Sequence, residues 1–358
     1  MNLIKEIQKF DDSQKVDNAF TPPASWYVEK SFLDLEKRAV FQNEWNFVGH
    51  LSDVQKEGDY FTGKLLNKPF VVLRKGEDVK AYYNICSHHG TCVARGKGKA
   101  EKLTCPYHGW EYSLEGKLKK IPKAGAIKEV HSKDLNLKEI PLKLIGPFIF
   151  LFFGGKAQEV SPKLLNFFEQ GQYSGLHFIK RIEYEISCNW KVYVDNYLDG
   201  GYHVPHMHPG LSTQLDISSY KTEINETFSV QRCAGEASEV KGDEVQGRVE
   251  GEAEYTWVYP NFMINRYGKW MDTNWVIPIN ENRCKVVFDY FHEEKVEDVD
   301  DALKASEKVQ LEDIDICDMV QTGLNSGVYD CGVYAPQFEA PMYSFHKLLK
   351  KSFLKELS

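Results

Sequence analysis

The chain has 358 residues, of which 42% are hydrophobic and 13% aromatic, so it carries enough apolar material to bury a substantial core. It has 44 Lys and Arg against 52 Asp and Glu, a net charge of −8 at pH 7, and no block of basic residues. These values indicate a globular protein and argue against nucleic acid as a partner.

The first residues, the apolar runs and the spacing of the cysteines indicate where in the cell the protein is expected. The first twenty residues contain acidic side chains and no apolar run after a basic region, so we expect neither a secretory signal nor a transit peptide. The richest apolar run, residues 144–153, is interrupted by Gly146 and Pro147 and is shorter than the ~18 residues that cross a bilayer. The eight cysteines do not have the spacing of a disulfide framework. We therefore predict a cytoplasmic protein with no membrane partner.

The N-terminal part of the chain has helical periodicity, and the part that follows has strand character. Apolar residues recur at helical spacing between Ser31 and Phe41, so residues 1–46 are expected to form a helical segment. From there the chain changes to short aromatic and β-branched segments separated by Gly and Asn. Residues 47–153 are therefore interpreted as a small antiparallel β domain. Its expected strands are 59–65, 69–74, 80–85 and 148–153.

A polar stretch that begins at Gly154 and Gly155 predicts a domain boundary, and residues 154–358 are expected to mix strands and helices. The expected strands are 179–186, 222–231, 254–258, 270–276 and 284–291, and the expected helices are 300–322 and 341–354. The acidic segment 236–254 is interpreted as a solvated loop or hairpin. The whole chain is thus predicted to have an α+β fold.

Two short motifs in the β domain combine cysteine with histidine. They read Cys86-Ser-His88-His89-Gly and Cys105-Pro-Tyr-His108-Gly-Trp, and supply two thiolates and two imidazoles from two loops. Two histidines in place of two cysteines on one iron is the ligation of a Rieske two-iron, two-sulfur cluster, whose potential is raised by the neutral ligands. The spacing assigns His88, and not His89, as the ligand.

A tetrahedral zinc site would use the same ligand types and is the alternative for this motif. Zinc motifs rarely combine Cys-x-His with Cys-Pro-x-His-Gly-Trp, so the spacing favours the iron–sulfur cluster.

A second group of possible metal ligands lies in the larger domain. His203 and His208 are five positions apart, and Pro205 between them stiffens a bend, so both imidazoles could face one cavity. With one carboxylate they would form the facial triad that binds non-haem Fe(II) and leaves positions open for dioxygen. The helix expected over 300–322 offers several carboxylates, and spacing alone does not choose between Asp313 and Asp318.

With these motifs the chain resembles the Rieske oxygenases, and within them the choline monooxygenase-like group, from about Pro22 to the C-terminus. The similarity includes the cluster motifs and the run from Asn189 to Pro205. It also includes the segments Tyr259–Asp272, Cys284–Phe291 and Glu312–Leu324.

The resemblance implies a Rieske domain at 47–153 and a catalytic mononuclear iron domain at 154–358, with a curved antiparallel sheet flanked by helices. It implies that Cys86, His88, Cys105 and His108 hold one 2Fe-2S cluster, and it selects Asp313 as the third ligand of one Fe(II) beside His203 and His208. It also implies a homotrimer in which one subunit's cluster serves its neighbour's iron.

A carboxylate three residues before the first iron-binding histidine bridges toward the cluster in many members of the family. That position is Gly200 here, and Asp199 stands one residue earlier. We therefore assign the bridging, catalytic role to Asp199, with Asp195 and Asn196 as other candidates.

The predicted function is an oxygenase that uses dioxygen to hydroxylate a small organic substrate, such as choline or another quaternary ammonium compound. The chain lacks a Gly-x-Gly-x-x-Gly fingerprint, so electrons are expected from a separate NAD(P)H-dependent reductase or a ferredoxin. The alternatives are an aromatic ring-hydroxylating dioxygenase subunit and a Rieske electron carrier without oxygen chemistry.

A quaternary ammonium group would be attracted to aromatic faces and to a carboxylate. Seven aromatic residues of the larger domain are candidates, although each is also a normal core residue. They are Trp257, Tyr259, Phe262, Trp270, Trp275, Tyr290 and Phe291.

Overall fold

The computed structural model describes residues 1–122, 135–235 and 251–358, which form two compact units. The larger unit comprises Met1–Phe41, Ser161–Phe167 and Gly175–Ser358, and the smaller unit comprises Gln42–Val160 and Phe168–Ser174. The smaller unit contains small antiparallel sheets, and the larger unit contains one large antiparallel sheet with helices. The predicted α+β fold class is confirmed.

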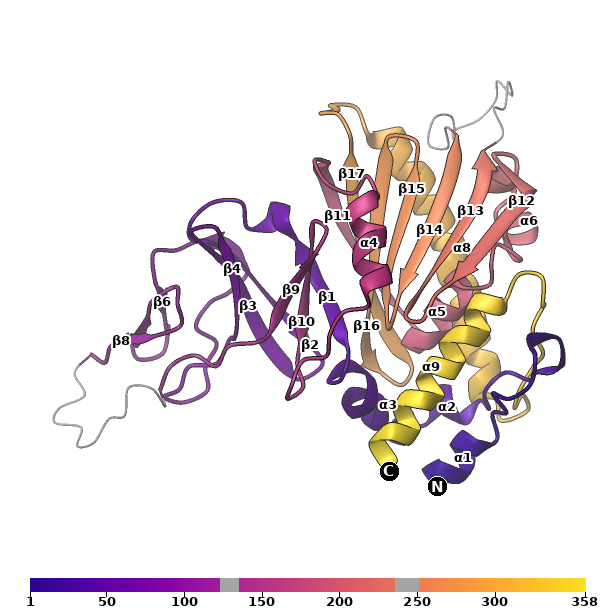
Figure 1. Ribbon diagram of the computed structural model, residues 1–358, viewed down its shortest axis with the longest axis horizontal. Helices are drawn as coiled ribbons and strands as arrows, with labels where there is room; N and C mark the ends of the chain where they lie inside the picture. The colour runs from indigo at the N-terminus through magenta and orange to yellow at the C-terminus, as the bar shows by residue number, and fades with distance from the viewer. Residues whose placement is uncertain (123–134, 236–250) are drawn as a thin grey trace. The chain divides into compact units, whose positions relative to one another are not determined.

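The smaller unit contains three antiparallel sheets (Figure 1). The first pairs β1 (Trp45–His50), β10 (Phe148–Phe152) and β9 (Leu142–Ile145). The second orders β4 (Asp78–Tyr83), β3 (Lys68–Lys75), β2 (Asp59–Leu65) and β5 (Lys97–Lys99). The third joins β6 (Leu103–Thr104), β7 (Glu111–Tyr112) and β8 (Leu118–Lys120). Every residue of β10 is buried, which explains its unbroken apolar sequence.

The larger unit is built on a seven-stranded antiparallel sheet in which six consecutive strands form a meander and β11 pairs with the last of them. In spatial order its strands are β11 (His177–Ile186), β17 (Arg283–His292), β16 (Trp270–Asn280), β15 (Phe262–Tyr267), β14 (Glu252–Val258), β13 (Phe228–Gly235) and β12 (Leu215–Ile224).

One predicted strand, 222–231, is wrong in its extent. β12 ends at Ile224 and β13 begins at Phe228, and the backbone N–H of Asn225 donates to the carbonyl of Phe228 at 2.8 Å across a tight turn. Apolar residues continue on both sides of this turn, so the sequence pattern did not reveal it. The predicted loop 236–254 lies outside the described residues as far as residue 250, and β14 begins at Glu252.

The helices belong mainly to the larger unit, where α5, α7, α8 and α9 contact strands of the large sheet. Figure 1 shows α8 running behind these strands. The helices are α1 (Leu3–Gln8), η1 (Val16–Asn18), α2 (Ser25–Val28), α3 (Lys30–Glu36), η2 (Lys37–Phe41), η3 (Leu51–Asp53), α4 (Pro162–Gln170), α5 (Trp190–Tyr197), α6 (Val204–Met207), α7 (Pro209–Ser212), α8 (Asp300–Asn325) and α9 (Ala340–Leu357).

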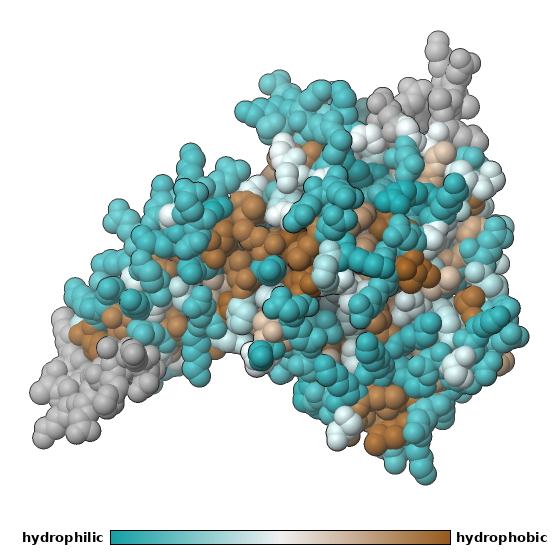
Figure 2. Space-filling model, in the orientation of Figure 1, coloured by the Kyte–Doolittle hydropathy of each residue, from teal (hydrophilic) through white to brown (hydrophobic). Residues whose placement is uncertain are grey.

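Within the described ranges, no helix has both the length and the apolar character of a bilayer-crossing segment. Hydrophilic residues cover most of the face shown in Figure 2, and smaller hydrophobic patches lie between them.

A fully buried ion pair anchors the start of α5. The ammonium group of Lys191 lies 2.5 Å from a carboxylate oxygen of Glu36 on α3, and the Trp190 indole N–H donates to the second oxygen at 2.7 Å. Asn189 caps α5 by accepting from the backbone N–H of Lys191, and its side-chain oxygen also accepts from the Lys191 ammonium at 2.8 Å. Burial raises the pKa of Glu36 and lowers that of Lys191, so each charge depends on the other.

Replacing Lys191 with Met should lower the free energy of unfolding by ~3–5 kcal/mol, because the Glu36 carboxylate would stay buried without its cation. Urea denaturation followed by circular dichroism measures the change. The matched control is the double variant Glu36→Leu with Lys191→Met, which removes both charges and should recover most of the loss. A double variant as unstable as the single one would contradict this account.

Candidate functional site

The two Cys-His loops of the smaller unit share one backbone design. The N–H of Cys86 donates to the carbonyl of Thr91 at 2.7 Å, and the N–H of Cys105 donates to that of Trp110 at 2.8 Å. The glycine four residues after each cysteine has a positive φ, and its N–H donates back to the cysteine carbonyl. Glycine adopts this conformation without strain, which explains the glycine that follows the histidine in both motifs. The two loops therefore present their cysteine and histidine side chains in equivalent turns.

His88 and His108, one from each loop, direct their Nδ1 atoms toward each other. Nδ1 of His88 lies 3.1 Å from Nδ1 of His108, whereas His89 lies beside this pair with its ring 3.9 Å from that of His88. The Trp110 ring stacks on His88 with centroids 4.7 Å apart. Burial and the neighbouring histidines lower the pKa of His88, which favours the neutral ring that a metal requires.

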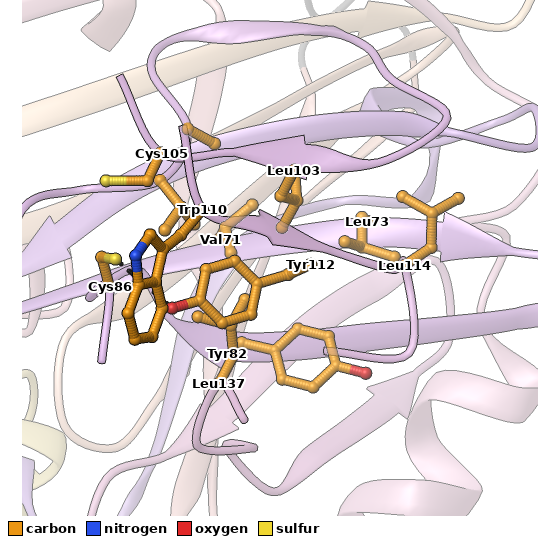
Figure 3. Close-up of a cluster of buried hydrophobic side chains, with 12 residues drawn as sticks. Val71, Leu73, Tyr82, Cys86, Leu103, Cys105, Trp110, Tyr112, Leu114 and Leu137 are labelled. Atoms are coloured by element: carbon orange, nitrogen blue, oxygen red, sulfur yellow. Dashed lines mark hydrogen bonds between the residues drawn. The ribbon is translucent and has the colours of Figure 1, made fainter. Parts of the chain in front are cut away.

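Both cysteines are buried at the edge of an apolar cluster formed by strands of the smaller unit, as Figure 3 shows. The Tyr112 hydroxyl lies 3.3 Å from Sγ of Cys86 and accepts a hydrogen bond from the backbone N–H of Ser87 at 3.1 Å. Burial raises the pKa of Tyr112 to about 12, so the hydroxyl remains protonated and can donate to a cysteine thiolate. The donor set of two thiols and two facing imidazoles fits a Rieske cluster.

The second group lies in the larger unit and joins three possible ligand atoms. Nε2 of His203 lies 3.1 Å from Nε2 of His208, and Oδ1 of Asp313 lies 3.1 Å from the His208 atom and 3.6 Å from the His203 atom. Three ligands ~2.1 Å from one metal at right angles are separated by about 3.0 Å. The triangle therefore has the size of one face of a metal's coordination shell, and its opposite side is free for substrate and dioxygen.

The local chain explains this arrangement. His203 and His208 flank the single turn of α6, with Pro205 in its first positions, and Asp313 is on α8. Asn196 of α5 donates to Oδ1 of Asp313 at 2.8 Å. The competing aspartate, Asp318, is exposed on the same helix and does not join the group.

The remaining nitrogen of each imidazole is bound to a carboxylate. Nδ1 of His203 lies 2.5 Å from Asp199, and Nδ1 of His208 lies 2.6 Å from Glu312. These contacts place the proton on Nδ1 and direct Nε2 toward the shared centre. Burial opposes a charged His208 ring, but Asp313 and Glu312 outweigh it and raise the His208 pKa. Glu312 was not among the predicted site residues, and its only signal in the sequence was its position beside Asp313.

The bridging candidates have different surroundings. Asp199 is buried and also accepts from the backbone N–H groups of Gly201 and His203. Asp195 contacts the Tyr27 hydroxyl at 2.7 Å and Nε2 of His346 at 3.0 Å. Asn196 contacts Asp313, as described above. Of the three, Asp199 is the one in contact with a histidine of the iron site.

A cavity of about 160 Å³ opens on the His203, His208 and Asp313 group. Its aromatic wall consists of Tyr193, Tyr197, Tyr220, Tyr255, Tyr267 and Phe288. None of the seven aromatic residues named as candidates lines it. Those seven are buried in the core of the larger unit, as their alternative interpretation stated.

Comparisons with known proteins agree with both centres. A model of the Rieske [2Fe-2S] domain matches residues 44–131, and a model of the catalytic domain of the ring hydroxylating alpha subunit matches residues 174–353. The second match rules out the alternative of a pure electron carrier, and the first rules out the zinc interpretation. The cofactors are therefore a Rieske cluster and a mononuclear iron with two histidines and one aspartate.

Individual relatives resemble the whole chain. A chloroplastic choline monooxygenase of Arabidopsis thaliana is 41% identical over 97% of this chain and 86% of its own length. A carnitine monooxygenase oxygenase subunit of Acinetobacter baumannii is 28% identical over 92% of this chain and 91% of its own length. The solved structure of a quaternary ammonium Rieske monooxygenase, described for carnitine oxidation and inter-subunit electron transfer, shares the fold. Its TM-score is 0.84 at 24% identity, over 94% of this chain and 96% of that one.

The prediction of a cytoplasmic location is wrong. Choline monooxygenases that match at least 95% of this chain, including those of Arabidopsis thaliana and Beta vulgaris, are chloroplastic. The prediction rested on the composition of the first residues, which does not identify a compartment.

Replacing Tyr112 with Phe should lower the reduction potential of the cluster, because the hydrogen bond to Cys86 stabilises the extra negative charge of the reduced state. A hydrogen bond worth ~0.5–1.5 kcal/mol corresponds to about 20–60 mV for one electron. Redox titration followed by visible absorption measures the shift. Tyr107→Phe, which alters an exposed tyrosine in the same loops, is the control and should leave the potential unchanged. An equal shift in both variants would contradict a specific role of Tyr112.

Replacing His208 with Ala should remove one iron per chain and leave the visible spectrum of the cluster intact, because the two groups of ligands share no residue. Iron analysis should fall from about three to about two atoms per chain. Loss of the cluster spectrum together with that iron would contradict two separate centres.

Proposed function

The chain belongs to the Rieske ring-hydroxylating oxygenase alpha subunits, and we propose that it is a monooxygenase that hydroxylates a small quaternary ammonium compound, with choline as the leading candidate. The observation that carries this proposal is the cavity, in which the His203, His208 and Asp313 group meets a wall of six aromatic side chains. Relatives named for choline and for carnitine, both quaternary ammonium compounds, support it.

The metal-binding residues have the following proposed roles. Cys86, His88, Cys105 and His108 hold the 2Fe-2S cluster, and His203, His208 and Asp313 hold the Fe(II). When bound, the cluster supplies single electrons and the iron supplies activation of dioxygen. Asp199 and Glu312 fix the orientation of the two imidazoles and retain their Nδ1 protons, and Asn196 holds the carboxylate of Asp313.

The reaction proposed for choline adds one oxygen atom to the carbon that bears the hydroxyl group. The product is an aldehyde hydrate. Two electrons and two protons reduce the second oxygen atom to water. The protein must therefore place that C–H bond beside the His203, His208 and Asp313 face and exclude water from it. Tyr193 and Gln310 line the cavity together with these three ligands. The Tyr193 hydroxyl donates to the Gln310 side chain at 2.8 Å, which holds both side chains in place.

Asp199 is the proposed route by which electrons reach His203. Gly200, where many family members have a carboxylate, has a φ of +70°, and an added Cβ would lie 2.3 Å from the carbonyl oxygen of Phe338. No side chain fits at this position, so another residue must provide the bridge. The bond between Asp199 and Nδ1 of His203 supports Asp199 in this role.

The electron donor is proposed to be a separate NAD(P)H-dependent reductase or a ferredoxin, and the active assembly a homotrimer. The missing dinucleotide fingerprint supports an external donor, as does the relative named as an oxygenase subunit. Exposed apolar side chains of the larger unit, Leu311, Met319, Val328 and Val333, support contacts between copies of the chain.

The holoenzyme, supplied with a surrogate reductase, should convert choline to betaine aldehyde hydrate with one labelled oxygen atom from ¹⁸O₂. Mass spectrometry of the product measures this incorporation. His203→Ala should abolish turnover while the visible spectrum of the cluster persists, because it removes one iron ligand only. Naphthalene is the comparison substrate for the aromatic dioxygenase alternative. Labelled naphthalene cis-dihydrodiol without a labelled choline product would overturn the proposal.

A further inference from the structure

The wall of the cavity carries a buried carboxylate in addition to that of Asp313. Strands β14, β15, β16 and β17 lie side by side in the large sheet (Figure 1), and their register aligns Tyr255, Asn265, Asp272 and Tyr290 in one row. Residues directly opposite each other on neighbouring strands share a face of the sheet. The first three of these residues line the cavity, and Asp272 is 1% exposed.

Hydrogen-bond donors of the cavity wall hold the Asp272 carboxylate in place. Its Oδ2 accepts from the Tyr267 hydroxyl, and its Oδ1 accepts from the side-chain amides of Asn265 at 2.8 Å and Asn274 at 3.2 Å. All three donors also line the cavity. These bonds fix the position of the carboxylate and keep its negative charge at the cavity wall.

Asp272 is connected to the iron site by a short chain of contacts. Asn265 binds Asp272 through its amide nitrogen and accepts from the Tyr197 hydroxyl at 2.8 Å. Tyr197 is on α5 beside Asn196, which donates to Asp313 at 2.8 Å. Asp272 and the three iron ligands also line the same cavity, so a ligand bound in it faces both.

The surroundings of Asp272 favour a cation without N–H groups. The rings of Tyr197, Tyr220, Tyr255 and Tyr267 line the cavity, and aromatic faces attract a quaternary ammonium group. Such a group has no hydrogen-bond donors to satisfy, so a carboxylate and tyrosine rings are sufficient partners.

The same cavity disfavours a substrate that carries a carboxylate. Of its lining residues in the described part of the chain, none is Lys or Arg, whereas Asp272 and Asp313 are both acidic. Beside Asp272 a buried substrate carboxylate would meet a like charge, and no Lys or Arg among these described lining residues would offset it.

We propose that Asp272, with the tyrosines around it, is the counter-ion for the substrate's quaternary ammonium group and that it makes the site selective for ammonium alcohols over ammonium acids. This inference rests on the proposed function and assigns the specificity of that site to one residue. The substrate's hydroxyl-bearing carbon then points toward the face formed by His203, His208 and Asp313.

The test compares choline with its neutral carbon isostere, 3,3-dimethylbutan-1-ol, and with carnitine. Dissociation constants are measured by calorimetry on the anaerobic holoenzyme, where no turnover occurs. Wild-type protein should bind choline at least ~30-fold more tightly than either other compound, as expected when a buried charge has an opposite charge beside it. Equal binding of carnitine and choline would overturn the exclusion of acids.

The variant Asp272→Asn keeps the shape of the side chain and removes its charge, so the preference for choline over the isostere should fall at least ~30-fold. Tyr267→Phe is the matched variant, because it removes one hydrogen bond to Asp272 and leaves the carboxylate in place. It should retain most of the preference. Iron content and the visible spectrum of the cluster confirm that each variant is loaded.

The two proposals fail in different ways. If Asp272 only braces the sheet, Asp272→Asn weakens choline and isostere binding equally and the preference is unchanged, which overturns this inference. If wild-type protein neither binds nor oxidises choline or carnitine, the proposed function fails first. A third outcome separates the two proposals. If wild-type protein oxidises choline and Asp272→Asn keeps the preference for choline over the isostere, the proposed function stands and Asp272 has no role in it.

Discussion

Two consecutive carboxylates of α8 bind the two ring nitrogens of His208, and the iron site depends on this clamp. Glu312 binds Nδ1 at 2.6 Å and Asp313 approaches Nε2 at 3.1 Å, across 104 and 105 residues of sequence. Neighbouring residues on a helix point in different directions, so one imidazole can fit between them only at one position and angle. The clamp therefore fixes the histidine segment against α8.

Helix α5 transmits this constraint to the rest of the larger unit. At its start, Asn189 and the buried pair of Lys191 and Glu36 fix its position against α3. At its end, Asn196 supports the iron-site aspartate, and Tyr197 reaches the Asn265 side chain on the sheet. A single two-turn helix thus joins the iron ligands to a residue of the large sheet that lines the same cavity.

The parts of the site that the sequence predicted are those encoded locally. The Cys-His motifs place ligands and turn-forming glycines within a few residues, and His203 and His208 flank one short bend. Asp313 required the family resemblance, because α8 carries several acidic residues at similar spacing. The aromatic wall was missed for a different reason. Two of its residues are on α5 and the other four are on β12, β14, β15 and β17, so no local stretch of sequence contains them together.

The histidines of the two centres use opposite ring nitrogens, and this difference matches their tasks. In the iron site Nε2 faces the metal, and the carboxylates on Nδ1 hold each ring rigidly in one tautomer. In the cluster loops Nδ1 of His88 faces Nδ1 of His108, and His108 is exposed whereas Cys86 and Cys105 are buried. One centre must retain a fixed geometry while it binds dioxygen and substrate. The other would hold its cluster between the exposed His108 and the buried Cys86 and Cys105, so that electrons could reach it while the thiolates stay covered.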